Sequence, residues 1–116
     1  MRENKNSSDL GKISQSPLGN PIRLAIALYL LPRQGAYFSS IAKALGLSHG
    51  NLRHHLNVML QHGLIEERYV IDKRPRKLII LTMKGARELN KILSAFNTLI
   101  SSSQGAETEK PREQDQ

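Results

Sequence analysis

The feature that most constrains this chain is the segment of residues 38–82, where helix signals and strand signals follow one another closely. Two short helices joined by a tight turn come first. Two strands follow, with four basic residues crowded into the loop between them. This order of elements is what a protein needs to place one helix in the DNA major groove and a basic hairpin on the backbone beside it. DNA binding is therefore the first hypothesis to test.

The residues before this segment begin with a helix signal at Asn20-Pro21. An Asn side chain can accept hydrogen bonds from the first free amides of a helix, and proline is tolerated at the first helical position. The helix then runs to Pro32 and is apolar over most of its circumference. We expect residues 22, 26, 29 and 30 to pack on the domain. The pattern leaves open whether the same core or a partner subunit covers Leu24, Leu28 and Leu31.

Residues 36–45 predict a very short strand and then a brief helix that Ser39 or Ser40 caps. Gly46 can adopt the left-handed conformation that ends a helix, and Ser48 can cap the next one. Two helices joined by a short glycine-containing turn, the second opening on serine, are typical of a helix-turn-helix.

The helix after Ser48 combines an apolar stripe with a polar face. The stripe consists of Leu52, Leu56, Met59 and Leu60 at helical spacing. No acid occurs between Ser48 and Gly63, whereas solvent-exposed helices usually carry acid–base pairs. Asn and Arg can pair with adenine and guanine edges, and a small residue such as Gly50 lets a helix N-terminus approach phosphate closely. We therefore expect DNA contacts from Ser48, His49, Gly50, Asn51, Arg53, His54 and Asn57. The alternative is a merely polar surface.

Four histidines raise the question of a metal or catalytic site: His49, His54, His55 and His62. Helical spacing argues against such a site, since His55 and His62 lie two turns apart and no Cys, Asp or Glu of this helix completes a ligand set. We expect no metal and no cofactor. His55 lies beside the apolar stripe and is expected to bond to the backbone or to a phosphate.

The loop between the two predicted strands concentrates positive charge. Its bases are Lys73, Arg74, Arg76 and Lys77, around a proline that stiffens the tip. Such a hairpin can lay cations on phosphates or into the minor groove beside the DNA-reading helix. Asp72 is expected to pair with Arg74 or Arg76. The alternative for this loop is a solvated turn.

Thr82 can cap a final helix over residues 83–102. The apolar residues of this helix recur at alternating intervals of three and four, which is the spacing of paired helices. We expect a dimer interface made by Ala86, Leu89, Ile92, Leu93, Phe96, Leu99 and Ile100. Packing of the helix on its own domain is the alternative. In a two-fold dimer, the DNA-reading helices would enter successive major grooves about 34 Å apart and favour a palindrome.

Composition limits the remaining possibilities. The chain of 116 residues has room for one small domain. Residues 1–17 and 103–116 are polar, and we expect both segments to be disordered. The whole chain has a net charge of +7, and residues 17–102 carry twelve Lys or Arg against four Asp or Glu, or +8, so the positive charge is concentrated on the folded part. The lack of cysteine excludes disulfides and thiolate sites. With no membrane-spanning run and no signal-peptide core, we expect a cytoplasmic protein associated with the nucleoid.

Two stretches resemble the winged-helix regulators of the MarR and ArsR type. LSHGNLRHHLNVMLQHGLIEE is similar to their recognition helix and the following strand, with His55-Leu56 where a His-Leu pair is frequent. DKRPRKLIILTMKG is similar to the MarR wing, with matches at Asp72, Arg74, Leu81, Thr82, Lys84 and Gly85. The resemblance covers roughly residues 20–100, and it is closest to compact variants in which a long final helix makes the dimer.

The resemblance implies dimeric, sequence-specific DNA binding and transcriptional control, usually repression. This chain departs from the family in having no cysteines for sensing and no carboxylate and histidine set on the last helix. Whether it has a small-molecule effector is therefore left open.

Together these observations predict an α+β, mostly helical fold. Residues 18–82 would form a winged helix-turn-helix with a two- or three-stranded β-wing, followed by the dimerisation helix. The predicted function is that of a homodimeric transcriptional regulator on double-stranded, palindromic DNA. No enzyme motif is found, such as a phosphate-cradling glycine loop or a supported Ser-His-Asp set. A winged-helix module for protein or RNA, and a nonspecific chromatin-type protein, remain as alternatives.

Overall fold

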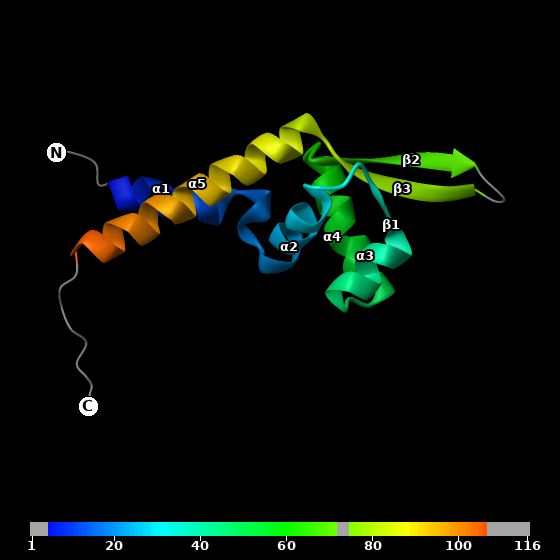
Figure 1. The fold of residues 1–116 in the computed structure, drawn as a ribbon, viewed down its shortest axis with the longest axis horizontal. Helices are drawn as coiled ribbons and strands as arrows, with labels where there is room; N and C mark the ends of the chain where they lie inside the picture. Colours follow the sequence, from blue (N-terminus) through cyan, green and yellow to red (C-terminus); the bar gives the residue numbers. More distant parts are fainter. Residues whose placement is uncertain (1–4, 72–74, 107–116) are drawn as a thin grey trace, which may run out of the picture.

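The computed structural model describes residues 5–71 and 75–106. Their elements are α1 (Lys5–Gln15), the 3-10 helix η1 (Pro17–Gly19), α2 (Pro21–Leu30), β1 (Ala36–Tyr37), α3 (Phe38–Leu45), α4 (His49–Gln61), β2 (Ile65–Ile71), β3 (Pro75–Leu81) and α5 (Met83–Ala106). Helices α2, α3 and α4 gather below the sheet, and the β2–β3 hairpin and α5 extend to opposite ends (Figure 1). This is a winged helix-turn-helix of the α+β class, mostly helical, so the predicted fold class is confirmed.

The ends of α2 and α4 form as the sequence predicts. Asn20 Oδ1 accepts hydrogen bonds from the amides of Ile22 and Arg23 at 2.9 and 3.0 Å, and thereby satisfies donors that the first turn of α2 leaves unpaired. Ser48 Oγ accepts from the amide of Asn51 at 3.1 Å at the start of α4. Gly46, with φ of 66°, ends α3 in the left-handed conformation.

The start of α3 differs from the prediction. Tyr37 occupies the N-cap position, and α3 begins at Phe38, so neither Ser39 nor Ser40 caps this helix. Both serines lie within the first helical turn. The reason is that Ala36 and Tyr37 are held in extended conformation by pairing with β3, which sets the point where the chain turns into the helix.

The sheet has three antiparallel strands in the order β1-β3-β2. Strand β3 pairs with β1 from Ala36 opposite Ile79, and with β2 from Ile65 opposite Leu81 to Ile71 opposite Pro75. Ile65 and Ile79 are buried, whereas Ile71 near the far end is exposed. The hairpin is therefore anchored to the core at one end and projects away from it at the other.

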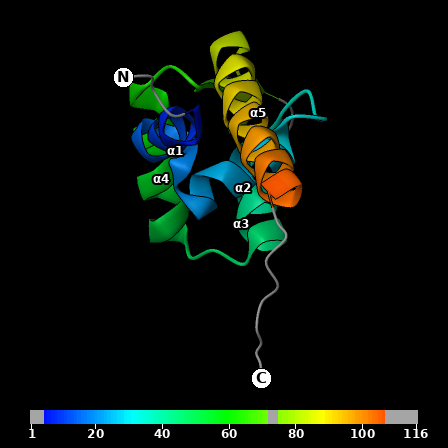
Figure 2. The same ribbon diagram turned by 90° about the vertical axis from the view of Figure 1, so that its left-hand side faces the viewer.

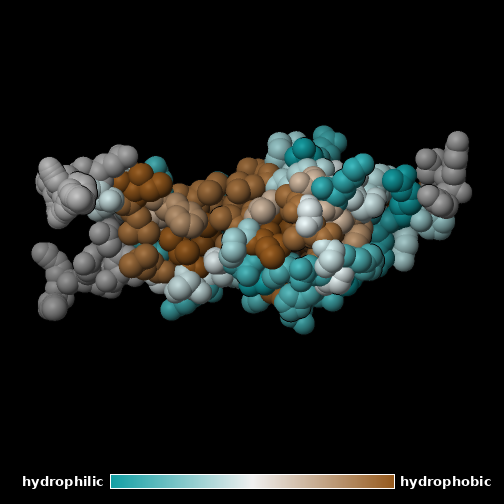
Figure 3. All heavy atoms as spheres, turned by 90° about the horizontal axis from the view of Figure 1, so that it is seen from below, coloured by the Kyte–Doolittle hydropathy of each residue, from teal (hydrophilic) through white to brown (hydrophobic). Residues whose placement is uncertain are grey.

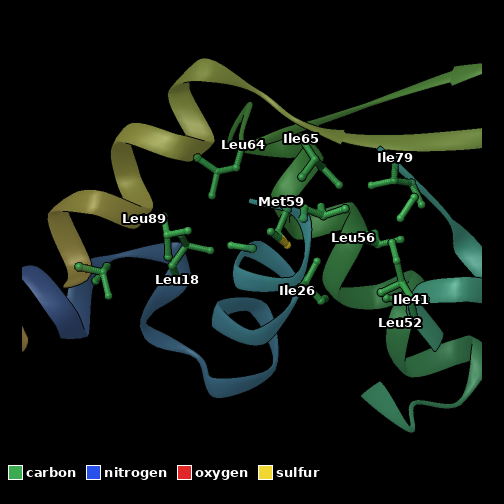
Figure 4. Packing of buried hydrophobic residues seen from close by; sticks show 14 residues of the cluster. Leu18, Ile26, Ile41, Leu52, Leu56, Met59, Leu64, Ile65, Ile79 and Leu89 are labelled. Carbon is green, nitrogen blue, oxygen red and sulfur yellow. The ribbon is translucent and has the colours of Figure 1, made fainter. Parts of the chain in front are cut away.

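The core lies between the helices and the near end of the sheet (Figure 4). Its largest fully buried side chains come from the helices, the sheet and the segments between them: Leu18, Ile26, Leu30, Ile41, Leu52, Leu56, Met59, Leu64, Ile79, Leu89 and Ile92. Leu24 packs partly against this core, whereas Leu28 and Leu31 are 42% and 48% exposed. The core of this chain thus covers Leu24 in part and leaves Leu28 and Leu31 at the surface.

Helix α5 is joined to the domain through its N-terminus. Thr82 Oγ1 accepts from the amide of Gly85 at 3.0 Å, which confirms the predicted cap, and donates to the carbonyl of Gly63 at 2.7 Å. A side chain at position 85 would bring its Cβ to 2.1 Å from the Leu64 carbonyl oxygen, so glycine is required there. Neither α5 nor any other helix of the described residues is long and apolar enough to cross a membrane.

Within the segment expected to be a disordered arm, the described residues are ordered. Residues 5–15 form α1, which lies alongside α5 in two perpendicular views (Figures 1 and 2). Although the segment has too few apolar residues to fold alone, α1 contacts α5, and its Ile13 packs against the common core to which Leu89 and Ile92 of α5 belong. Ser16 Oγ also donates to Glu88 Oε2 at 2.6 Å. Helix α5 itself continues to residue 106, four residues beyond its predicted end.

Candidate nucleic-acid interface

Helix α4 presents the predicted polar face to solvent. Of the seven predicted contact residues, Arg53 is partly buried and six are exposed: Ser48, His49, Gly50, Asn51, His54 and Asn57. The opposite face carries Leu52, Leu56 and Met59 into the core, while Leu60 is partly buried. A Cβ at Gly50 would meet nothing within 4 Å, so the start of the helix is open to a close approach.

Arg53 is tied to an acidic residue from outside the helix. Its Nη2 donates to Oε2 of Glu67 on β2 at 2.6 Å, and its Nε donates to Oδ1 of Asn57 one turn further along α4 at 3.2 Å. The other carboxylate oxygen of Glu67 lies 3.4 Å from Nζ of Lys77 on β3. Glu67 therefore connects α4 to both long strands. The sequence argument considered only acids within α4, and it missed this strand residue.

The pKa of Glu67 reflects two opposing effects. Partial burial alone raises the pKa, but the hydrogen bond and positive charge of Arg53, together with the charge of Lys77, outweigh burial. The net pKa lies below the usual 4.5. Glu67 thus stays ionised at neutral pH, as its two cationic neighbours require.

His55 lies in a different environment from the one expected. It is 8% exposed, and its Nδ1 lies 2.9 Å from Nη1 of Arg23 on α2. It bonds to this side chain, so the expectation of a backbone or phosphate partner is not met. Burial lowers the pKa of His55, and the positive charge of Arg23 and then His54 lowers it further. The neutral ring therefore serves as a structural link between α2 and α4.

Aromatic and basic side chains continue the surface from α4 to the first residues of β3. The ring of His49 lies 4.6 Å from that of Phe38 at the start of α3. Next to it, the guanidinium of Arg76 stacks 3.8 Å above the ring of Tyr37. A shallow hollow lies here between α3 and β3, lined by Tyr37, Phe38, Ser39, Arg76 and Lys77. The polar face of α4 and the basic strand β3 are thus parts of one continuous surface.

Two of the four predicted wing contacts can be placed. Arg76 and Lys77 are exposed on β3, and Lys77 Nζ also lies 5.8 Å from the centre of the Tyr69 ring. Lys73 and Arg74 lie outside the described residues, as does the predicted pairing of Asp72 with Arg74 or Arg76.

The predicted dimer face of α5 is divided between the core and the surface. Leu89 and Ile92 are 1% and 0% exposed, so they pack within their own chain and cannot line an interface as predicted. Leu93 packs partly against the same core, and Ala86 is also partly buried. Further along the helix, Phe96 and Ile100 are 36% and 54% exposed.

An apolar groove marks this second part of α5. It is lined by Phe96, Leu99, Ile100 and Ser103 of α5 and by Leu10 of α1. Figure 3 shows apolar atoms gathered over this half of the molecule, on the side away from the hairpin. Leu10 was not expected to belong to any interface, because its segment was expected to be disordered. The exposed apolar surface is therefore shared by both helices.

The fold, together with the polar face of α4 and the basic strand β3, defines a helix-turn-helix DNA-binding protein. Comparison with known proteins agrees. Residues 18–68 match the family described as helix-turn-helix domain. The solved structure of the transcriptional regulator homologue protein from Pyrococcus horikoshii OT3 is 41% identical, with a TM-score of 0.77 over 82% of this chain and 96% of that chain. A search of curated proteins found no match.

Two more distant structures share the fold. MepR, a transcription regulator of the Staphylococcus aureus multidrug efflux pump MepA, is 22% identical, with a TM-score of 0.69 over 90% of this chain and 75% of that one. The YusO protein from Bacillus subtilis is 18% identical, with a TM-score of 0.69 over 89% of this chain and 78% of that one. The chain belongs to the helix-turn-helix transcriptional regulators, and its winged-helix fold resembles that of the MarR and ArsR type.

Proposed function

We propose that this protein binds a specific double-stranded DNA site as a homodimer and represses transcription by occupying that site. The observation that carries the proposal is the continuous surface from the polar face of α4 to the basic strand β3. A helix inserted in the major groove would bring the adjacent hairpin onto the backbone or into the neighbouring minor groove. A regulator of this kind would act on the nucleoid, in the cytoplasm.

Helix α4 is the element proposed to enter the major groove. The DNA-contacting residues proposed for it are Ser48, His49, Gly50, Asn51, Arg53, His54 and Asn57. Exposure of six of them and the absence of acids within the helix support this assignment. Base edges in the major groove carry distinct donor and acceptor patterns, so these side chains can discriminate between sequences.

The hairpin is proposed to supply affinity. Its basic residues Lys73, Arg74, Arg76 and Lys77 would contact phosphates, which carry no sequence information directly. Arg76 is already ordered by stacking on Tyr37 at 3.8 Å, so less side-chain freedom is lost when it binds. We expect its contribution to depend strongly on salt concentration, because each phosphate contact releases counterions.

Dimerisation is proposed to use the apolar groove of α1 and α5. Leu10, Phe96, Leu99 and Ile100 form a patch to which the same patch of a second copy can be complementary across a two-fold axis. The buried Leu89 and Ile92 instead hold α5 to its own domain. A dimer of this kind would present two α4 helices to a palindromic operator.

Selection of bound sites from random double-stranded DNA at near-physiological salt tests the proposal. We expect an inverted repeat whose half-sites are about one helical turn apart. Enrichment of no motif, with binding that depends only on salt, would indicate a nonspecific DNA-binding protein instead. Preferential binding to single-stranded RNA in a parallel selection would also contradict the proposal.

A further inference from the structure

We infer that Glu67, a strand residue outside the groove-facing helix, fixes the base preference of Asn57 by holding Arg53 in place. In this assignment Asn57 reads the base, and Arg53, counted above among the proposed DNA contacts, is reassigned with Glu67 as a positioning residue. The inference rests on the proposed function and deepens it, because it names the base chemistry that one side chain of α4 selects.

The two hydrogen bonds of Arg53 use the same edge of its guanidinium group. Nε donates to Asn57 at 3.2 Å, and Nη2 donates to Glu67 at 2.6 Å. The Glu67 carboxylate is well placed to act as an anchor, since it is 16% exposed and also faces Lys77 at 3.4 Å. A side-on pair of donors is one of the two edges with which an arginine can grip a guanine edge. Because this edge is already engaged by Asn57 and Glu67, Arg53 is better suited to orient Asn57 than to bind a base itself.

The orientation of the Asn57 amide follows from the chemistry of its partner. A guanidinium group has donors and no acceptor, so the amide atom that faces it must be the oxygen. Asn57 is exposed, and because its oxygen already accepts from Arg53, its N–H donors are the groups it can offer most freely to DNA. A paired contact with adenine needs both the amide oxygen and the nitrogen on one base edge. Donors alone fit the acceptors of guanine, N7 and O6, or O4 of thymine.

Glu67 is the residue on which this orientation depends. Without the carboxylate, Arg53 would lose its charge-assisted hydrogen bond and could turn away from Asn57. The amide would then be free to rotate and to present its oxygen as well as its nitrogen. Removal of Glu67 is therefore expected to change which base is accepted, in addition to any effect on affinity.

The experiment is selection of bound sites from random DNA with the wild type and four variants. With the wild type we expect guanine or thymine at one position of each half-site, and Asn57→Ala should relax preference at that position. Glu67→Ala should admit adenine there, with at least a tenfold change in relative enrichment. Glu67→Gln should restore most of the preference, because its amide oxygen can still accept from Arg53. Glu66→Ala is the matched control, since Glu66 pairs with Arg68 at 2.6 Å on the same strand.

Each outcome bears on the inference differently. If Glu67 had a purely structural role, Glu67→Ala would lower the melting temperature or weaken binding to all sites alike. It would leave the preferred base unchanged. That result, or adenine at the Asn57 position in the wild type, would overturn the inference and leave the proposed function intact. A wild type that enriches no motif would remove the proposed function and the inference with it.

Discussion

Arg23 of α2 and His55 of α4 join these two helices through a hydrogen bond of 2.9 Å between Nη1 and Nδ1. Because the guanidinium can only donate, the imidazole must accept at Nδ1, and its single proton therefore lies on Nε2. Protonation of His55 would replace this acceptor with a second donor facing a fixed positive charge. The link is thus sensitive to pH.

We expect the stability of the protein to fall on mild acidification. The pKa of His55 is lowered below 6.5 in the folded state, first by burial and then by Arg23 and His54. Between that pKa and 6.5, the unfolded chain binds more protons than the folded protein. The contribution of the neutral ring is therefore complete above pH 6.5, and it is lost as the pH falls through the folded-state pKa. Urea unfolding followed by circular dichroism at several pH values measures this dependence.

A variant separates His55 from the other titrating groups in the same experiment. His55→Gln removes the titrating ring, so its stability should vary less between pH 7.5 and pH 5 than that of the wild type. His62→Gln, at an exposed position near the end of α4, serves as the control and should keep the wild-type slope. Equal slopes for the wild type and His55→Gln would contradict the assignment.

Two helical glycines should respond to alanine in opposite ways. Gly85→Ala would bring Cβ to 2.1 Å from the Leu64 carbonyl oxygen and 2.7 Å from Leu81 Cδ1, and it should lower the free energy of unfolding by about 1–3 kcal/mol or more. Gly50→Ala has open space around it and should raise stability by up to about 1 kcal/mol. If the proposed DNA approach is correct, Gly50→Ala should nevertheless weaken DNA binding. Thermal unfolding and titration with the selected operator measure the two effects.

Arg76→Ala should weaken binding to all DNA sequences by a similar factor. The proposed phosphate contact is sequence-independent, so the slope of log K against log salt should decrease in magnitude by about 1, while the selected motif stays the same. Arg87→Ala is the matched control, because Arg87 is exposed at the start of α5 and its loss removes the same charge at a site away from the hairpin. This variant should keep the wild-type slope. Fluorescence anisotropy at four salt concentrations distinguishes the two variants. An Arg76→Ala variant with an unchanged slope would place this arginine outside the DNA contact.

A charged residue in the apolar groove should separate the proposed dimer. Phe96→Glu would bring a carboxylate from each subunit into an apolar contact, and we expect the dissociation constant of the dimer to rise at least tenfold. Met83→Glu is the matched control, because Met83 is 73% exposed on the same helix but lies outside the groove. Sedimentation velocity over a range of concentrations gives the comparison. A wild type that sediments as a monomer at all concentrations would contradict the dimer.

Local rules predicted most of the fold. The caps at Asn20, Ser48 and Thr82 all form as expected, because each depends on a side chain and amides two or three residues away. The apolar stripe of α4 identified the buried side of that helix, and with it the exposed side. These features are encoded within a single turn or helix, where sequence spacing determines geometry.

The predictions that failed depend on contacts between distant segments. Helix α1 exists because α5 provides a surface for it, and the polar sequence of α1 gives little sign of that. Glu67 reaches Arg53 across an element boundary, and His55 reaches Arg23 across 32 residues, so neither pairing could be read from one helix. Leu89 and Ile92 follow a spacing that serves a dimer seam and an internal core equally well, and only the packed fold distinguishes the two.

The packing of α1 along α5 has a practical consequence for handling the protein. The first turn of α1 and the last turn of α5 emerge side by side, at the extremity of the molecule remote from the hairpin (Figure 1). A fluorophore or affinity tag attached directly at either of these helix ends would thus sit far from the proposed DNA-facing surface. It would, however, adjoin the groove at Phe96 and Ile100, so oligomeric state is best measured on protein from which such additions have been cleaved.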